Sequence, residues 1–537
     1  MSSINGSTML IALPAVFRGI HLDPLAPGNS AYLLWLLMGY TLVQAVLVVT
    51  LGRIGDMFGR VRMYNLGFVL FTTGSVLLSL TWSTGPTGAM ELIIFRMIQA
   101  LGGALEVSNS AAILTDAFPM EQRGMALGIN MVMMTAGMFI GMVVGGLLAE
   151  AHWRWVFLMN VPVGIIGTIW AYLMLRELGI HKAEPIDWVG NSTFAAGLTM
   201  VLVGIIYGTT PSGTSATGWT TPFVLAMLIG GVILLGLFIV VEQHVKAPLF
   251  RLNLFRIRAF TAGNIAGLLQ SLARGGMLFM LSIWLQGIWL PLHGYDYEVT
   301  PLWAGICILP EVAAVTVFGV ISGRLSDRFG ARPFATAAMI LTAIAFALLM
   351  IQPVNFSYLN FALILVVSGM GIGLFSSSNT MAIMNSLPAK HRGAGSGMRY
   401  TFQGIGSPLS QGIFMTLMTI GLNATVPKAI YNGLIQSGVT TGVAMQISKI
   451  PPFSYLFAAL LGYNPLGTLL GPNVLNSLSP AVAAQLTSRS YFPQMISAAF
   501  DHGLKIVLGW SITMCLIAAG VSWLRGGKYI YKEKDES

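Results

Sequence analysis

Ionisable side chains inside long apolar segments are the residues of this 537-residue chain that could do chemistry. Glu106 and Glu311 each stand in an apolar run of membrane-crossing length, where a charge is costly unless it is paired or hydrated. Burial favours the protonated form of a carboxylate, so both are candidates for binding and releasing a proton near neutral pH. The alternative is that they pair with Arg96, Arg274 or Arg399 and only hold helices together.

Helical geometry sets the depth of the two acids. Glu311 precedes Gly323 by twelve residues, so it lies about 18 Å from the inner edge of its segment at 1.5 Å per residue, near the midplane. Glu106 follows Arg96 by ten residues in one segment, two to three turns from its inner end. Ionisable groups at such depths point to a functional site.

The elements that must hold these residues are membrane-spanning helices. The chain is 55% apolar and 9% charged, against about 25% charged in soluble domains. Many apolar runs reach the roughly 18 residues that can cross a hydrocarbon core. The predicted fold class is therefore an all-α polytopic membrane protein with about 14 transmembrane helices. The expected spans are 4–22, 31–51, 63–82, 89–115, 123–149, 155–175, 188–208, 221–241, 259–290, 301–322, 334–352, 358–386, 394–421 and 498–524.

The Lys and Arg residues set the expected orientation. An even number of spans puts most of the 28 on one side, which the positive-inside rule makes cytoplasmic. We therefore expect a multi-pass protein of the plasma membrane with both termini cytoplasmic. The net charge of +9 reflects this topology and attraction to the lipid bilayer, and we expect no nucleic-acid site. The segments on this side are 52–62, 116–124, 176–187, 242–258, 323–333, 388–393 and 525–537.

Neither catalysis nor metal binding has support in the sequence. Cys307 and Cys515 stand in apolar surroundings of separate segments, so we expect small buried hydrophobes and not a disulfide or a metal pair. The seven histidines show no ligand spacing, and no phosphate loop or nucleophile elbow occurs. We expect no enzyme activity, no metal and no cofactor.

Two charged turns, each bounded by glycines, stand 271 residues apart. Residues 52–60 read Gly-Arg-Ile-Gly-Asp-Met-Phe-Gly-Arg, and residues 323–330 read Gly-Arg-Leu-Ser-Asp-Arg-Phe-Gly. Asn109 is echoed by Asn379 at nearly the same offset. The chain therefore contains two parallel repeats of about six spans each, with a two-helix insert between them.

The two turns are candidates for a gate on the cytoplasmic side. Asp56 and Asp327 stand where a turn meets the next helix, so each could cap exposed backbone N–H groups. Arg53, Arg60 and Arg324 could bridge to neighbouring helix ends, with contacts that break when this side opens. The alternative is that these charges only fix the topology. The gating candidates are Gly52, Arg53, Asp56, Gly59, Arg60, Gly323, Arg324, Asp327, Arg328 and Gly330.

These motifs together resemble the major facilitator superfamily. Residues 52–62 resemble its signature loop between helices 2 and 3. Arg96 to Gln99, followed by Gly102 and Gly103, resembles its helix-4 motif. The resemblance implies a fold of two six-helix bundles around a central pathway.

Further motifs are similar to the fourteen-span drug:proton antiporter branch of that superfamily. Residues 153–164 and 187–190 resemble the branch's entries to its sixth and seventh helices. Glycines four residues apart line one helix face and permit close helix approach, with a sliding surface between the halves as an added hypothesis. The residues that match the glycines of the branch's helix-5 motif are Gly137, Gly141, Gly145 and Gly146.

Two positions depart from the pattern of this branch. Counted from Ala12-Leu13-Pro14, the acid early in helix 1 is Asn5 here, which weakens any proton site in that helix. The proline after the second glycine of the helix-5 motif is Met142, which puts in doubt the bend credited with sealing the antiporter against leak. The first segment has only a short apolar run, residues 9–17, so we expect a further segment upstream of Met1, with a first helix shortened on its cytoplasmic side as the alternative.

The resemblance implies a proton-driven exporter of amphipathic or cationic organic compounds that works as a monomer by alternating access. Arg96 takes the role of tuning the proton site, beside Glu311 and Glu106. The alternatives are an importer or facilitator of a small metabolite and, from another class, a non-transporting sensor or channel. The expected partners are a small-molecule substrate, protons and the lipid bilayer. The candidates for lining the cavity are Asn5, Gln99, Asn109, Arg274, Asn379 and Arg399.

The expected domain boundaries follow the repeats. Residues 1–175 form the N-terminal six-helix bundle, and 176–258 form the two-helix insert with a cytoplasmic linker. Residues 259–524 form the C-terminal six-helix bundle, and 525–537 form a cytoplasmic tail. The extracellular segment 423–496 contains no Asp or Glu, and we expect short interfacial helices over the outer mouth, with an idle loop as the alternative.

Overall fold

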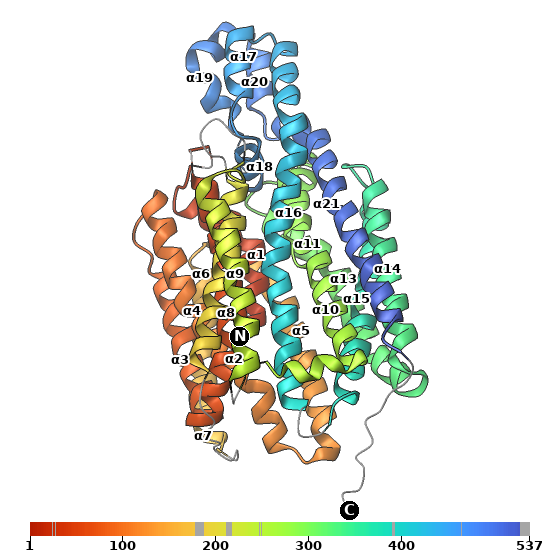
Figure 1. Cartoon of the computed structure of the whole chain (residues 1–537). Coiled ribbons are helices and arrows are strands. Elements are labelled where there is room, and N and C mark those ends of the chain that lie inside the picture. Colours follow the sequence, from red (N-terminus) through yellow and green to blue (C-terminus); the bar gives the residue numbers. More distant parts are fainter. Residues whose placement is uncertain are drawn as a thin grey trace, which may run out of the picture.

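The chain folds into a bundle of long helices (Figure 1). The computed structural model describes residues 1–23, 25–26, 28–177, 187–210, 217–245, 248, 250–388, 392–462 and 464–526. Within these residues there is no β-strand, and 13 helical stretches are long and apolar enough to cross a membrane. The all-helical membrane fold is therefore confirmed, whereas the count of 14 spans is not, because the first helix is not among the 13.

The first helix of the first half buries polar as well as apolar side chains. Asn5 and Thr8 are buried in α1, which packs along α5. The helix α4 packs against α2 and α3, and α3 packs against α7. The helices of this half are α1 (Ser2–Gly19), α2 (Asn29–Phe58), α3 (Arg60–Ser79), α4 (Gly85–Ala117), α5 (Met120–Ala151), α6 (Trp155–Leu158) and α7 (Asn160–Met174).

The second half repeats this packing. The helix α15 packs against α13 and α14, and α14 packs against α21, just as α4 and α3 do in the first half. The helices of this half are η1 (Leu252–Arg256), α10 (Arg258–Arg274), α11 (Met277–Trp284), η2 (Leu285–Trp289), α12 (Leu290–Leu292), α13 (Thr300–Phe329), α14 (Ala331–Ile351), α15 (Tyr358–Asn385), α16 (Arg392–Gln436) and α21 (Tyr491–Trp523).

The two halves meet along two helix pairs, α5 with α13 and α2 with α16. The insert between the repeats consists of α8 (Trp188–Thr209) and α9 (Pro222–His244), which pack against each other. The helix α8 also packs against both α2 and α16, so the insert lies against the junction of the halves.

Four short helices follow the 45-residue α16, whose far end extends beyond the bundle (Figure 1). They are α17 (Thr441–Ser448), α18 (Pro452–Leu460), α19 (Leu466–Ser477) and α20 (Pro480–Thr487). Figure 1 shows α17, α19 and α20 at the top of the molecule, with α18 below them at the end of the bundle. The described residues of 423–496 thus include the end of α16, the four short helices and the start of α21.

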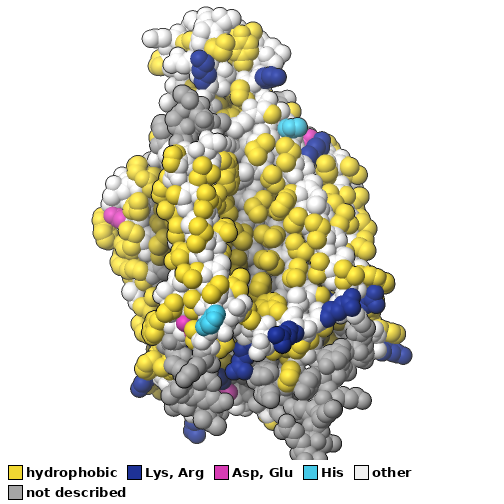
Figure 2. Space-filling model, in the orientation of Figure 1, with side chains coloured by type: hydrophobic (Ala, Val, Ile, Leu, Met, Phe, Trp, Pro, Cys, Tyr) yellow, Lys and Arg dark blue, Asp and Glu magenta, His cyan; other side chains and the backbone are white. Residues whose placement is uncertain are grey.

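The surface has the charge pattern of a membrane protein. Figure 2 shows apolar side chains over the middle of this face. Most of the Lys and Arg side chains visible in that view lie near the lower end, opposite α17, α19 and α20. By the positive-inside rule we expect the lower end to be cytoplasmic, and we call the opposite end the outer end.

Candidate functional site

A single glycine joins the helices at each of the two repeated turns. Gly59 separates α2 from α3 with φ 108° and ψ 123°, and Gly330 separates α13 from α14 with φ 86° and ψ 156°. Both lie in the left-handed region that glycine adopts without a steric penalty. The sequence predicted loops at 52–62 and 323–333, which is wrong, because the helices continue through the charged residues on both sides.

Arg60 is the centre of an ion-pair network at the first turn. Its Nε lies 2.7 Å from Asp56 Oδ1 and its Nη1 lies 2.6 Å from Asp116 Oδ2. Asp56 precedes Arg60 by four residues, on the other side of Gly59, and Asp116 lies at the end of α4. Arg60 therefore ties the ends of α2, α3 and α4 of the first half together, and its role in a gate stays a prediction.

Glu177, just after α7, caps the start of α3. Its two carboxylate oxygens accept hydrogen bonds from the backbone N–H groups of Arg60 and Val61, at 2.9 and 3.0 Å. A carboxylate at this end of a helix is favoured by the helix dipole. The sequence assigned the cap to Asp56; that assignment is wrong, because Asp56 lies within α2 and pairs with Arg60.

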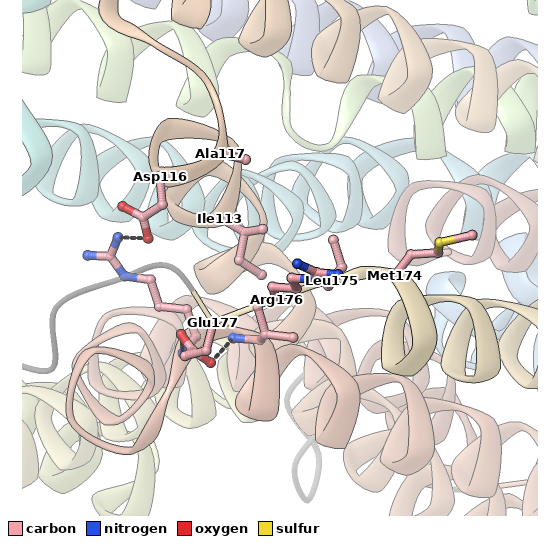
Figure 3. Close-up of a pocket in the computed structure, with 9 residues that line it drawn as sticks. Ile113, Asp116, Ala117, Met174, Leu175, Arg176 and Glu177 are labelled. Atoms are coloured by element: carbon pink, nitrogen blue, oxygen red, sulfur yellow. Dashed lines mark hydrogen bonds and ion pairs between the residues drawn. The ribbon is translucent and has the colours of Figure 1, made fainter.

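A pocket of about 190 Å³ opens beside this network (Figure 3). In the figure, dashed lines mark the ion pair of Asp116 and a hydrogen bond of Glu177. Sequence reasoning missed Glu177, although an acid directly after an apolar span, in a chain with 19 acids, was an available signal. The lining residues are Arg60, Val61, Ile113, Asp116, Ala117, Met174, Leu175, Arg176 and Glu177.

The second turn repeats the backbone of the first but not its described side-chain network. Ala331 follows Gly330 where Arg60 follows Gly59. Arg324 is exposed, and the Arg328 guanidinium lies 5.3 Å from the ring centre of Phe329. The side chain of Asp327 lies outside the described residues. Of the two turns expected to form a gate, only the first therefore has a described ion-pair network.

Arg53 and Gly52 also occupy defined places. Arg53 donates from Nη2 to the backbone carbonyl of Pro248, which links α2 to the segment between α9 and α10. A β-carbon on Gly52 would lie 3.7 Å from Ser108 Cβ, and one on Gly323 would lie 3.4 Å from Ser377 Oγ. Both glycines thus lie against the neighbouring helix of their own repeat, α4 or α15.

A buried polar cluster joins α1, α3 and α4. Arg96 is 3% exposed, and its Nη1 donates to Asn5 Oδ1 at 2.9 Å and to Gln99 Oε1 at 2.7 Å. Asn5 Nδ2 donates to the same Gln99 oxygen, and Gln99 Nε2 donates to Ser75 Oγ at 2.7 Å. The Arg96 guanidinium also lies 4.4 Å from the ring centre of Tyr40. The structure thus brings Asn5, Arg96 and Gln99 together, with the two amide side chains as neutral partners of the Arg96 cation.

The two membrane acids lie in different halves and share no partner. Glu106 in α4 is buried, and its Oε1 has no hydrogen-bond partner within the described structure. Glu311 in α13 is 2% exposed; its Oε1 accepts from Ser368 Oγ at 3.2 Å, and its Oε2 has no partner there. The charge of Arg274 acts on Glu311, but no ion pair joins them in the part of the chain described. The charge of the Met1 amino group acts on Glu106, which also accepts a hydrogen bond from the backbone of Ser2. No ion pair joins either acid to Arg96, Arg274 or Arg399 within the described residues, and proton binding by the two acids stays a prediction.

The remaining polar candidates hold helices together. Asn109 donates to the carbonyl of Leu105 in its own helix. Asn379 Nδ2 donates to the carbonyl of Gly263 in α10, and its Oδ1 accepts from Arg525. Arg399 Nη1 donates to Thr380 Oγ1 in α15 and to Gln403 Oε1. These contacts favour packing over cavity lining for Asn379 and Arg399.

Arg525 is a buried side chain that the sequence placed in a cytoplasmic tail. It is 4% exposed, and its Nη2 donates to Asn379 Oδ1 at 2.6 Å. Burial lowers the pKa of Arg525 to about 10. Arg525 therefore packs against α15 of the C-terminal bundle, beside the start of the expected tail.

The glycines of α5 divide between two surfaces. Gly137, Gly141 and Gly145 face α1, where a β-carbon on Gly141 would lie 2.3 Å from Ser7 Oγ and one on Gly145 would lie 2.6 Å from Thr8 Cγ2. Gly146 faces the other half, where its β-carbon would lie 2.5 Å from Leu302 Cα. Close helix approach is thus confirmed, but three of the four glycines serve packing within one bundle.

The geometry defines a membrane protein of two repeated helical bundles with isolated acids inside, which is the architecture of a secondary transporter. The family model of the Major Facilitator Superfamily matches residues 1–190 and 188–411. The chain belongs to this superfamily and is accordingly a transporter, not an enzyme.

Relatives carry more specific names. The chain is 26% identical over 425 residues to the riboflavin transporter RibZ of Clostridioides difficile, covering 79% of this chain and 86% of the relative. It is 24% identical over 495 residues to the multidrug transporter protein MdtP of Bacillus subtilis, covering 90% and 84%. A crystal structure of the nucleoside transporter NupG superposes with a TM-score of 0.52 at 12% identity, covering 86% of this chain and 98% of that one, which shows the shared fold.

Proposed function

We propose that this transporter exports amphipathic or cationic organic compounds out of the cell across the plasma membrane, in exchange for protons. The observation that supports the proton coupling is Glu311, a carboxyl buried in α13 that, within the described residues, accepts a hydrogen bond from Ser368 and has no partner for Oε2. A carboxyl without a counter-ion can bind a proton when its site is closed and release it when water reaches the site. The name of the relative MdtP supports drug-like substrates.

The proposed cycle uses the two halves as rigid units. When the inner end opens, the two halves separate at that end and substrate enters from the cytoplasmic side, while the Arg60 network and the Arg53 contact hold the first half and the insert together. When the outer end opens, substrate leaves and Glu311 takes up a proton. Arg274, a cation whose charge acts on Glu311, belongs to the same half.

The test is flux of a dye panel in vesicles under an imposed pH gradient. Glu311→Gln and Glu106→Gln remove a titratable group while keeping the shape of the side chain. Glu150→Gln, at the exposed outer end of α5, is the matched control. We expect Glu311→Gln to abolish the response of export to the gradient and Glu150→Gln to keep it. Full gradient-driven export by both buried-acid variants would refute the assignment.

A second candidate function is uptake or facilitated movement of a small metabolite. The riboflavin transporter among the relatives favours it, and so does Asn5, which replaces an acid of the antiporter branch. In the same vesicles, flux driven by a substrate gradient alone, with no effect of the pH gradient on the parent protein, would establish this function instead.

A further inference from the structure

The short helix α18 is buried at the outer end of the bundle. Its residues Tyr455, Leu456, Phe457 and Leu460 are between 0% and 3% exposed. Such burial is unusual for a nine-residue helix in a segment outside the membrane spans. The helix therefore fills space between other elements and does not lie on the surface as an interfacial helix would.

The helix α18 contacts both halves of the transporter. The ring of Phe457 packs edge-on against that of Phe17 in α1, with centroids 5.6 Å apart. On the other side, a β-carbon on Gly287 in η2 would lie 3.3 Å from the carbonyl carbon of Ala459. The helix also packs against α2 and α16. It thus lies between helices of the first half and helices of the second.

Very little space is left beneath α18. The cavity there has a volume of about 10 Å³, too small for any substrate. Its walls come from α2, α11 and α16 of the two halves and from α18 itself. The lining residues are Leu33, Phe279, Ile283, Met415, Leu456, Phe457 and Leu460. An apolar contact of this kind can separate without leaving unpaired polar groups.

Tyr297 joins α1 of the first half to the segment between α20 and α21. Its backbone carbonyl accepts from Arg18 Nη2 at 3.3 Å, and its hydroxyl donates to the carbonyl of Arg489 at 2.8 Å. Its ring lies against Gly462, where φ is 69° and a β-carbon would come within 2.5 Å of the ring. Gly462 follows α18 closely, and Pro451 precedes it, so the helix is bounded by a turn at each end.

We propose that α18 is the outer gate of the transport pathway, and that the contact of Phe457 with Phe17 breaks each time substrate leaves on the outer side. The proposal rests on the alternating-access transport proposed above. The family model ends at residue 411, so the gate lies outside the matched region. The gate adds a moving element to the closure made by Gly146 against Leu302.

The first test measures how easily a reagent from the outer side reaches the space beneath α18, and it does not depend on transport. In a background with Cys307→Ala and Cys515→Ala, which removes both native thiols, Leu33→Cys places one thiol beneath α18. A membrane-impermeant maleimide is added from the outer side. We expect slow labelling, and labelling several-fold faster when Phe457→Ala or Gly287→Leu loosens α18. The same labelling rate with α18 intact and loosened would overturn the gate.

The second test locks the gate. A short bifunctional methanethiosulfonate joins the thiols of Phe17→Cys and Phe457→Cys, which links α1 to α18. The control pair is Ser437→Cys with Tyr491→Cys, within the outer end of the second half, where the two native hydroxyls lie 2.8 Å apart. We expect the first crosslink to abolish dye export, to leave dye binding from the inside intact, and to be reversed by reducing agent. Full export by the locked protein would exclude α18 as the gate. If export by the uncrosslinked protein does not respond to the pH gradient, proton coupling is refuted and the gate is not.

Discussion

At the scale of single residues, the inner closure of the first half depends on an acid that belongs to no recognised loop motif. Glu177 accepts from two backbone N–H groups at the start of α3, and Arg60 at the same place pairs with two further carboxylates. The start of α3 therefore holds three acids around one cation. The helix end and the ion pairs stabilise one another because both fix Arg60.

We predict that Glu177→Ala destabilises the protein by about 1 kcal/mol, the usual cost of losing a helix N-terminal cap. Glu177→Gln should lose less, because an amide oxygen still accepts one of the two bonds. The measurement is thermal unfolding in detergent, with Glu150→Ala as the control at an exposed acid. Equal melting temperatures for Glu177→Ala and the control would show that the cap contributes nothing.

Tyr297 gives a prediction about pH. Burial raises the pKa of Tyr297 to about 12, against the opposing effects of the nearby Arg489 and Arg18 charges. A raised pKa means that the protonated, donating hydroxyl contributes its stability fully below the unfolded pKa of about 10 and loses it as the pH rises through the folded pKa. Tyr297→Phe should therefore cost about 1 kcal/mol.

The cost of Tyr297→Phe should be the same at pH 6, 7.5 and 9, measured by thermal unfolding at each pH. The pH profile of transport should keep its shape in this variant, because the hydroxyl does not titrate in that range. A deficit that changes between pH 6 and 9 would contradict the assignment of the donor.

At the scale of elements, hydropathy identified the spans well and their ends poorly. The sequence expected a helix over 63–82, whereas α3 begins at Arg60, and it expected 31–51 where α2 continues to Phe58. Charged residues such as Asp56 and Arg60 end an apolar run, yet they pair with each other across Gly59, so α2 can continue to Phe58 and α3 can begin at Arg60. This pairing is a contact in the folded protein, and the hydropathy of a sequence window contains no information about it.

The buried part of the site was predicted as residue types but not as partners. Arg96, Glu106 and Glu311 stood out because charges are rare in apolar runs. Their partners, Asn5 for Arg96 and Ser368 for Glu311, lie 91 and 57 residues away. The role of α18 could not be read from the sequence, because an apolar nine-residue stretch fits a surface loop and a buried wedge equally well.

The glycine turns allow a matched pair of substitutions. Gly59→Ala forces a β-carbon into a backbone with φ 108°, which costs about 1–3 kcal/mol. Gly52→Ala, in α2, places a β-carbon 3.7 Å from Ser108 and should be tolerated or slightly stabilising. Thermal unfolding of the two variants in detergent should differ by several degrees. A similar melting temperature for both would mean that the turn relaxes to a right-handed backbone.

At the scale of the whole molecule, the question is with which half the insert moves. Two polar contacts attach it to the first half: Thr50 Oγ1 donates to Asn191 Oδ1 at 2.7 Å, and Arg53 donates to the carbonyl of Pro248. Two apolar contacts join α8 and the segment after α9 to α16 of the second half: Gly412 lies against Ile205, and Phe402 lies against Phe250. Hydrogen bonds inside a membrane resist separation, whereas apolar surfaces surrounded by lipid can slide.

We therefore predict that the insert moves with the first half. Joining Thr50→Cys to Asn191→Cys, in the background without native cysteines, should leave export near the level of the uncrosslinked protein. Joining Ile205→Cys to Gly412→Cys should reduce export strongly, because it ties α8 to the half that moves away from it. The measurement is dye export from vesicles before and after reduction of each crosslink. The opposite pattern would place the insert with the second half, and inhibition by both would mean that α8 moves against both halves in every cycle.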